Sequence, residues 1–596
     1  MIPQIIDSIE RSQPRDTVRV TFDDGVVLEG KVGETIEAFL QAKQALFNTP
    51  YDTAIMGGIL DGKLRELSYP IRRDCSLVPV LFSHSDGRRI YRRSLVLLLT
   101  TAVEEVFPGT GVNVGYAISG GGFYCAVTKR PPLSEDELAR LEAYMHQLVE
   151  ENHPITKGSV SLEEARSYFA TRGASDKLRL LEARLRDDLT LYTLRGRSDY
   201  FYGYMVPSTG YLPLFKLHRT ETAFYLQYPV AESPTELHEF NPETKIGTVF
   251  HEAEEWLHRM GVEDIGRLNR IVRRNATQEL ILVAEALHEQ RIAAIASTIK
   301  QQHAERGVRL VLIAGPSSSG KTTFSKRLAI QLLAHGLRPF TLELDNYFVD
   351  RDLTPRDAAG NFDFEALEAV NLPLFNEHLA ALVRGEAVHL PHFDFVNGKS
   401  VHGRLAQLVQ NQILIIEGIH GLNPRLVYSV PRDNLFRIYI SPLTALNIDM
   451  HNRVPTTDVR LLRRIVRDAA TRGNDAATTL NRWESVRAGE KRNIFPYQEN
   501  ADAIFNSALA YELAALRPLA EPLLLQVEPK TSAHLEANRL LSFVRWVEPL
   551  APGQRDLVPD TSLLREFIGG SILSDYHPAD LQKQDQTQEI SALRHD

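Results

Sequence analysis

The chain has 596 residues and a mass of 67.1 kDa, which is enough for about four domains. It carries 67 Lys and Arg against 76 Asp and Glu, a formal charge of −9, with 43% hydrophobic and 24% charged residues. This balance excludes disorder throughout the chain and a strongly basic coat for nucleic acid.

Cysteine usage and hydropathy predict a cytoplasmic protein. The only cysteines are Cys75 and Cys125, too few for a disulfide framework, which is typical of a reducing compartment. Residues 1–16 carry acidic side chains early and no long apolar run, so we expect no secretory signal. No stretch approaches the ~18 apolar residues of a membrane span, so we expect no membrane partner.

The first element in chain order is a β-hairpin. Residues 18–32 read VRVTFDDGVVLEGKV, in which two β-branched runs flank Asp24-Gly25. Asp-Gly between strands predicts a two-residue type I′ turn, which needs positive φ. A helix over 34–47 follows. We therefore predict a β-grasp-like domain over residues 1–85.

The next part, residues 86–228, combines helices and strands. Helices are predicted over 90–107 and 134–151, and Ser134 with Glu137 has capping-box spacing. A glycine cluster at 120–122 precedes the strand-like FYCAV. We expect an α+β domain here, then a helical connector over 229–304 with one helix at 279–302.

The pattern changes to alternating strands and helices at residue 309. Strands are predicted over 309–315, 340–344, 412–416 and 435–440. Strands that alternate with helices indicate a parallel sheet with crossover connections, an α/β fold. We assign this domain to residues 305–530 and a C-terminal helix and tail to 531–596, of which 577–596 are polar and expected to fray.

A phosphate-binding loop follows the first of these strands. The sequence from residue 315 fits G-x-x-x-x-G-K-[ST], followed by one more threonine. The predicted ATP-binding residues are Gly315, Pro316, Ser317, Ser318, Ser319, Gly320, Lys321, Thr322 and Thr323. Small residues let backbone N–H groups surround phosphate oxygens, Lys321 can reach the β- and γ-phosphates, and the Thr322 hydroxyl can hold Mg²⁺.

Two acidic residues stand at the ends of predicted strands. Asp345 follows FTLEL, and Glu417 follows ILII, so both lie at the edge where an open α/β sheet binds ligands. Asp345 can accept the proton of an acceptor hydroxyl, and Glu417 can serve the metal. The alternatives are a helix N-cap for Asp345 and an exposed loop acid for Glu417. The chain contains no N-K-x-D guanine motif, which argues against a regulatory GTPase.

The segment DVRLLRRIVRDAATRG (458–473) predicts a helix with Asp458 as its N-cap. Four arginines lie on one face at i, i+3, i+4 and i+7: Arg460, Arg463, Arg464 and Arg467. Arg472 follows at the helix end. Arginine clusters stabilise charge on a transferring phosphoryl group, while the alternative is a solvated helix face.

These motifs resemble the uridine kinase and phosphoribulokinase group of P-loop kinases. GPSSSGKTT, LDNYF, PHFDFVNG, ILIIEGIH and RRIVRDAATRG occur in that family's order over about 290–530. The resemblance implies ATP as phosphoryl donor with Mg²⁺, Lys321 and Asp345 as catalytic residues, and Arg467 and Arg472 as lid arginines. It further implies substrate contacts from Tyr347, Glu365, Phe393, Phe395 and Arg464, with Glu365 on ribose hydroxyls and the two phenylalanines on the nucleobase.

The chain departs from this family where the base is read. The family's base-reading histidine falls at Gly398, a base-contacting arginine at Asn474 and a glutamine at Arg482. The resemblance therefore covers the phosphoryl-transfer residues but leaves the acceptor open.

The N-terminal half resembles threonyl-tRNA synthetase. Residues 18–80 are similar to its TGS domain, a β-grasp module, and residues 90–220 to its editing domain, through IYRRSLVLLLTTAVEEVFP and DYFYGYMVPSTGYLPLFKL. The family's metal-type positions fall on Arg93, Leu97, Phe201 and Met205. Such side chains cannot form the N/S/O shell that zinc requires, so we expect neither zinc nor editing hydrolysis.

Three functions follow from these patterns. The first is an ATP-dependent kinase that transfers the γ-phosphate to the 5′-hydroxyl of a nucleoside. The second is a kinase of a sugar, sugar phosphate or polyol. The third is a nucleotide-gated RNA- or ribosome-associated module, against which the charge of −9 argues. The expected partner is thus a small-molecule acceptor rather than nucleic acid, and a homo-oligomer stays open.

Overall fold

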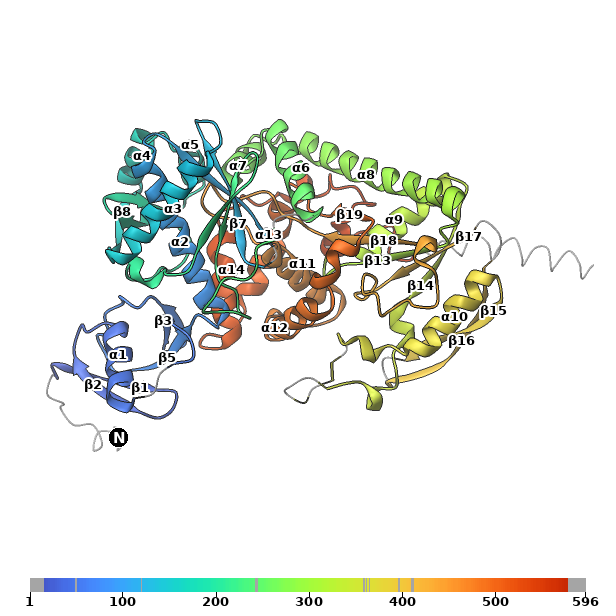
Figure 1. Cartoon of the computed structure of the whole chain (residues 1–596), viewed down its shortest axis with the longest axis horizontal. Helices are drawn as coiled ribbons and strands as arrows, with labels where there is room; N and C mark the ends of the chain where they lie inside the picture. The colour runs from blue at the N-terminus through green and yellow to red at the C-terminus, as the bar shows by residue number, and fades with distance from the viewer. Residues whose placement is uncertain are drawn as a thin grey trace, which may run out of the picture.

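The fold is described from a computed structural model. It describes residues 15–48, 51–118, 120–241, 245–356, 360, 362–363, 365–394, 397–408 and 412–576. A small N-terminal sheet and an α+β region lie on one side of the molecule, and a parallel sheet lies on the other (Figure 1). The long helix α8 (Thr277–Arg306) runs along the top of this view, from the centre over the half that holds the parallel sheet. The mixed α/β architecture predicted from the sequence is confirmed.

The N-terminal sheet has the strand order β2-β1-β5-β3-β4 and packs against one helix. Its elements are β1 (Thr17–Phe22), β2 (Val27–Lys31), α1 (Ile36–Phe47), β3 (Ile55–Leu60), β4 (Lys63–Arg65) and β5 (Cys75–Leu81). The hairpin is confirmed, but its type I′ turn is wrong, since only Gly25 has positive φ (84°). The Asp24 carboxylate instead accepts a hydrogen bond from the N–H of Val26, which favours a different turn.

The second region contains two antiparallel sheets, with the orders β11-β12-β7-β6 and β10-β9-β8. Its elements are α2 (Ser85–Val106), β6 (Gly111–Ile118), β7 (Gly122–Thr128), α3 (Glu135–Glu150), β8 (Ile155–Ser161), α4 (Leu162–Thr171), α5 (Ser175–Leu181), β9 (Asp188–Leu194), β10 (Arg197–Asp199), η2 (Thr209–Tyr211), β11 (Lys216–Arg219) and β12 (Phe224–Gln227). The predicted capping box of Ser134 and Glu137 is present at the start of α3. Helix α2 begins five residues earlier than its apolar run predicts.

Three helices connect this region to the parallel sheet. They are α6 (Lys245–Arg259), α7 (Ile265–Arg273) and α8. Ile292, Ala296 and Ile299 of α8 are fully buried in the same core as α9 (Lys321–Ala334), the helix after the phosphate loop. No helix in the described part of the chain combines the length and apolarity that crossing a membrane requires.

The parallel sheet has the strand order β14-β17-β13-β18-β19, and every neighbouring pair is parallel. The strands are β13 (Leu310–Ala314), β14 (Arg338–Glu343), β17 (Gln412–Glu417), β18 (Leu435–Ser441) and β19 (Ala503–Asn506). Leu310 and Leu312 face one core, while Val311 and Ile313 face the other, so both faces of the central strand are buried. Strand β19 is not among the strands predicted from the sequence.

The remaining elements surround this sheet. The helices are α10 (Leu372–Arg384), α11 (Thr456–Thr471), α12 (Ala476–Asn493), α13 (Glu512–Leu525), α14 (Ser532–Val544), α15 (Pro552–Arg555) and α16 (Arg565–Ile568). The 3₁₀ turns are η3 (Leu344–Tyr347), η4 (Arg351–Leu353), η5 (Leu367–Ala369), η6 (Arg432–Asn434) and η7 (Phe495–Asn500). An antiparallel pair, β15 (Ala387–Asp394) and β16 (Lys399–Gln407), completes the set.

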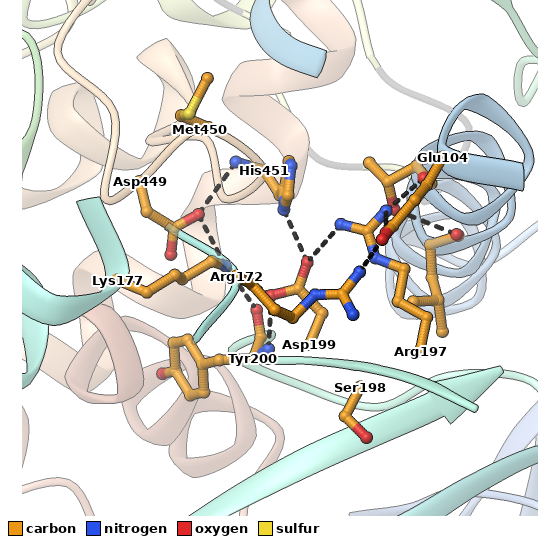
Figure 2. A network of polar contacts seen from close by, with 12 residues as sticks. Glu104, Arg172, Lys177, Arg197, Ser198, Asp199, Tyr200, Asp449, Met450 and His451 are labelled. Carbon is orange, nitrogen blue, oxygen red and sulfur yellow. Dashed lines mark hydrogen bonds and ion pairs between the residues drawn. The ribbon is translucent and has the colours of Figure 1, made fainter. Parts of the chain in front are cut away.

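A buried polar network joins the N-terminal half to the loop that precedes α11 (Figure 2). The Lys177 ammonium of α5 lies 2.9 Å from the Asp199 carboxylate and 3.0 Å from that of Asp449. Asp199 also lies 2.6 Å from the ring of His451. The N–H of Met450 donates to Asp176, so backbone as well as side chains hold this loop. The two halves therefore share a desolvated interface.

Candidate active site

The phosphate loop lies between β13 and α9, at the carboxyl end of the central strand. Helix α9 begins at Lys321, and Gly320 before it has a φ of 89°. A side chain at Gly315 would overlap the carbonyl of Ile440, and one at Gly320 would overlap Leu563. Glycine is needed at both positions because the chain passes too close to its neighbours for a Cβ. The next strand along the chain, β14, lies at a sheet edge, so the loop sits at a change of strand order.

The polar groups of this loop are of the kind that bind an anion. The Ser318 and Ser319 hydroxyls are buried without a hydrogen-bond partner, although buried polar groups are normally paired. The Lys321 ammonium donates to the carbonyls of Gly315 (3.0 Å) and Pro316 (3.4 Å), and burial lowers its pKa. The loop thus gathers a desolvated cation and unsatisfied hydroxyls at the N-terminus of α9, where an anion is favoured.

Thr322 and Glu417, the two predicted metal ligands, are hydrogen-bonded to each other. The Thr322 hydroxyl donates to Glu417 Oε1 at 2.7 Å, and the Ser325 hydroxyl lies 3.4 Å from its other oxygen. Burial raises the pKa of Glu417 to about 7, while Lys321 opposes this rise. A hydroxyl and a desolvated carboxylate are oxygen ligands of the kind that Mg²⁺ takes beside phosphate. These residues therefore fit the metal that the resemblance implies.

Asp345 and Glu365 are two carboxyl groups that both lie close enough to Lys321 to interact with its charge. Asp345 lies in η3, two residues beyond β14, and its side chain remains open to solvent. Desolvation by surrounding protein nevertheless raises its pKa, and Lys321 and Arg472 are close enough to oppose the rise. Burial raises the pKa of Glu365 to about 7, with Glu490 contributing to the rise and Lys321 opposing it.

The aromatic candidates lie in the core beside η3. Tyr347 is 1% exposed, and its hydroxyl lies 3.1 Å from His378. Phe393 is also 1% exposed and packs edge-on against Phe348 at 5.7 Å. Phe395 lies outside the described residues. Tyr347 and Phe393 are therefore packed in the protein interior and present no open ring face in this structure.

Helix α11 separates its arginines into two groups. Arg460 and Arg463 are buried and pair with Glu490 and Glu512 rather than presenting free charge to a phosphate. Each neutralises a carboxylate of a neighbouring helix. Arg460 Nε also donates to the carbonyl of Ser317 in the phosphate loop at 2.9 Å. The predicted N-cap is wrong, because the helix begins at Thr456, and Asp458 in its first turn instead pairs with Arg539 at 2.6 Å.

The other three arginines converge on one carboxylate. Arg464, Arg467 and Arg472 lie 3.3, 3.0 and 3.6 Å from Asp468. Arg464 also donates to the Ser317 hydroxyl at 2.8 Å, which ties α11 to the phosphate loop. Arg472 has 53% of its side chain exposed and lies close enough to Asp345 for the two charges to interact.

Three acidic residues that shape this site carried no recognised role in the sequence. Asp468 organises the arginines but lies inside a motif read for its basic residues. Glu490 accepts from the N–H of Ser317 at 2.9 Å, and Glu566 accepts from Thr323. No local pattern could identify these two, because their partners lie 173 and 243 residues away.

In the N-terminal half, the four positions that correspond to metal ligands in threonyl-tRNA synthetase are occupied by side chains that pack in the core or bind the backbone. Leu97, Phe201 and Met205 are at most 3% exposed and share one hydrophobic core. The Arg93 guanidinium donates to the carbonyl of Tyr204 at 2.7 Å. Within the residues described, no group of three or more His, Cys, Asp or Glu side chains could hold a metal. An arginine and three apolar side chains therefore occupy the positions where zinc would need its ligands.

The two halves of the chain are similar to different known proteins. Residues 310–513 match the model of the phosphoribulokinase / uridine kinase family. Together with the parallel sheet and the Gly315–Thr322 loop, this match shows a P-loop kinase fold in the C-terminal half. Two solved structures are also similar. One, provisionally assigned as a fructose transport system kinase from Silicibacter, is 24% identical, with a TM-score of 0.25 over 36% of this chain and 98% of its own. The other, a possible uridine kinase from Bacillus stearothermophilus, is 19% identical, with a TM-score of 0.22 over 33% of this chain and 88% of its own.

The N-terminal region matches threonine–tRNA ligases. The ligase of Burkholderia lata is 37% identical over 173 residues, which is 29% of this chain and 27% of the ligase. That of Symbiobacterium thermophilum is 32% identical over 210 residues, 35% of this chain and 31% of the ligase. The chain thus spans less than a third of the length of these relatives.

Proposed function

We propose that the protein is an ATP-dependent kinase that transfers the γ-phosphate to a hydroxyl of a small molecule, with the 5′-hydroxyl of a nucleoside as the first candidate. One observation carries this proposal. The Thr322–Glu417 pair, the Lys321 ammonium and the Asp345 carboxylate lie around one end of β13, within electrostatic reach of one another. These are the charges that phosphoryl transfer needs on its donor side and its acceptor side.

Each residue has a distinct role in the proposed reaction. Lys321 leaves the loop carbonyls to neutralise the β- and γ-phosphates. Asp345 orients the acceptor hydroxyl and takes its proton, for which a pKa raised by desolvation is favourable. Arg472 closes over the transferring group from the end of α11, and Arg464 holds the loop through Ser317.

Thr322 and Glu417 would hold Mg²⁺, which, when bound, neutralises negative charge that builds on the phosphate oxygens. The two buried serine hydroxyls of the loop gain partners when phosphate oxygens lie in the cradle. The fit of the metal and of the phosphate therefore rests on the desolvated carboxylate of Glu417 and the buried hydroxyls of Ser318 and Ser319.

A sugar, sugar phosphate or polyol is the second candidate acceptor, and one observation favours it. Gly398, at the family's base-reading position, has a φ of 66°, and a Cβ there would lie 2.7 Å from Nε of Arg351. The positive φ strains any side chain at this position, and glycine itself offers none to contact a base, so a nucleobase would need a different reader. Glu365, whose side chain packs against Gly489, can accept from hydroxyls of either acceptor class.

The deciding experiment measures ADP release from ATP and Mg²⁺ with a panel of nucleosides, sugars, sugar phosphates and polyols. We expect turnover with one acceptor class and a fall of about 10³-fold or more in Asp345→Asn, with ATP binding retained. Glu343→Gln is the matched control, because Glu343 is an exposed acid two residues earlier. Turnover by no acceptor would exclude the kinase, and full activity in Asp345→Asn would exclude its role as the base.

We propose that the N-terminal half, which we divide into residues 1–85 and 86–228, supports the kinase rather than hydrolysing aminoacyl esters. The packed positions Leu97, Phe201 and Met205 and the buried Lys177–Asp449 contact support this role. An RNA-associated role remains the rival, and salt-sensitive co-purification of RNA would favour it. Both buried cysteines suit a reducing cytoplasm.

A further inference from the structure

The C-terminal segment Val558–Tyr576 forms one wall of the phosphate loop. It lies outside the residues that match the kinase family, which end at 513. Leu563 packs directly on Gly320, and Phe567 lies under the guanidinium of Arg463 at 5.0 Å. The Lys326 ammonium of α9 donates to the carbonyls of Leu573 (2.7 Å) and Ser574 (2.8 Å). The segment is therefore fixed to the first turns of α9.

This wall places one carboxylate on donors of the loop. Oε2 of Glu566 accepts from the Thr323 hydroxyl at 2.9 Å and from the Thr323 N–H at 3.3 Å. Lys321 and Arg472 are both close enough for the negative charge of Glu566 to favour their charged forms. A carboxylate from the far end of the chain thus lies among the cations of the phosphate site.

The Thr323 donors belong to the group that phosphate oxygens would use. They lie in the first turn of α9, where backbone N–H groups have no partner within the helix and favour anions. Glu566 carries the same sign of charge as phosphate and occupies the same donors. A phosphate chain extended along this turn would displace the carboxylate or be repelled by it.

We propose that Glu566 is an internal competitor of the nucleotide, a residue that occupies the Thr323 donors in the empty site and limits the affinity for phosphate donors. This inference rests on the proposed function, because it requires phosphates to bind the loop. Leu563, Leu564 and Phe567 are at most 1% exposed, so the backbone of the segment stays anchored. Only the partly exposed Glu566 side chain has to turn away when phosphate binds.

The test is calorimetric binding of ADP and of inorganic tripolyphosphate, each with Mg²⁺, to the full chain. Glu566→Gln keeps an acceptor for Thr323 but removes the charge, and we expect it to bind both ligands about tenfold more tightly. Asp560→Asn is the matched control, because it removes an exposed acid from the same segment and should leave affinity unchanged. Glu566→Ala removes the whole carboxylate. Thermal unfolding measured in parallel shows whether the C-terminal segment still packs on the loop, so that a change in affinity can be assigned to the lost charge.

The outcomes are distinct. Equal affinity in wild type and Glu566→Gln would overturn the competitor, and weaker binding in Glu566→Gln would instead make Glu566 a contributor to binding. If the folded wild type and both Glu566 variants bind neither ligand, the proposed kinase function fails, and this inference fails with it. Binding of either ligand by Glu566→Gln but not by wild type would support both the proposed kinase function and the competitor role of Glu566.

Discussion

The Nζ of Lys177 lies 3.0 Å from the Asp449 carboxylate, and neither side chain is more than 3% exposed. Asp449 belongs to the loop that leads into α11, whereas Lys177 belongs to the N-terminal half. Burial opposes the charge of Lys177, but Asp199 and Asp449 outweigh it and raise its pKa. The loop that leads into the arginine helix α11 is thus paired with Lys177, a cation in the region that matches threonine–tRNA ligases.

Removal of that cation should destabilise both halves. In Lys177→Met, the buried Asp449 carboxylate loses its ammonium partner, and Asp199 keeps His451 and Arg197 but loses Lys177. We expect a loss of about 3–5 kcal/mol in the free energy of unfolding. Urea unfolding followed by circular dichroism measures this loss. Lys300→Met, which changes an exposed lysine of α8, is the control. Equal stability of the two variants would show that the network contributes no net stability.

The pH dependence of stability should reveal Glu254 on α6. Burial raises its pKa to about 7 from an ordinary value of 4.5, with Arg453 opposing. A carboxyl with a raised pKa contributes stability that is complete below about 4.5 and lost as the pH rises through about 7. Glu254→Gln avoids this loss, so its stability advantage over wild type should grow by about 3 kcal/mol between pH 4.5 and 8. Glu252→Gln on the same helix, whose side chain is 48% exposed, should show no such trend.

Two arginines of α11 should respond in opposite ways. Arg463 is fully buried with Glu512, so Arg463→Met should lower the free energy of unfolding by about 3–5 kcal/mol. Arg472 is half exposed, so Arg472→Met should fold normally but lower kcat by about 10²–10³-fold. Denaturation and steady-state kinetics of both variants decide the assignment. A destabilised Arg472→Met would place that residue with the structural pair instead.

Removal of divalent cations should affect chemistry and not folding. Treatment with EDTA should abolish phosphoryl transfer, and Mg²⁺ should restore it, while the thermal unfolding of the N-terminal half stays unchanged. Thr322→Val removes the hydroxyl that donates to Glu417 and should raise the Mg²⁺ concentration needed for half-maximal turnover. Thr298→Val, an exposed threonine of α8, serves as its control. Restoration by Zn²⁺ together with a stabilised N-terminal half would contradict the expected loss of the zinc site.

The strand, loop and helix around Lys321 could be predicted from the sequence because the pattern is local. Gly315 to Thr322, the apolar strand before them and the helix after them are consecutive, so spacing alone places Lys321 and Thr322. Glu417 and Asp345 were also predictable, since parallel strands bring their carboxyl ends to one edge. The side chains that surround the loop could not be predicted, because Glu490 and Glu566 contact it only through tertiary packing.

The arginine helix shows where periodicity misleads. Spacing at i, i+3, i+4 and i+7 places four arginines on one side of α11, and the prediction assumed that this side faces phosphate. In the fold, helices α12 and α13 pack against α11 and supply Glu490 and Glu512 to its first two arginines. Periodicity gives the side of a helix but not the charges that pack against it. β19 was missed for a related reason, since its four residues carry too short a pattern.

The wall formed by Leu563 also has a consequence for synthesis of the chain. Leu563 follows Gly320 by 243 residues, so the phosphate loop emerges from the ribosome long before its final contact. At ~5–20 residues per second, the delay is roughly 12–50 s. During that time the loop has its strand and helix but lacks both the Leu563 packing and the Glu566 carboxylate. A nascent chain should therefore bind phosphate with an affinity different from that of the finished protein, a difference that stalled chains of defined length can measure.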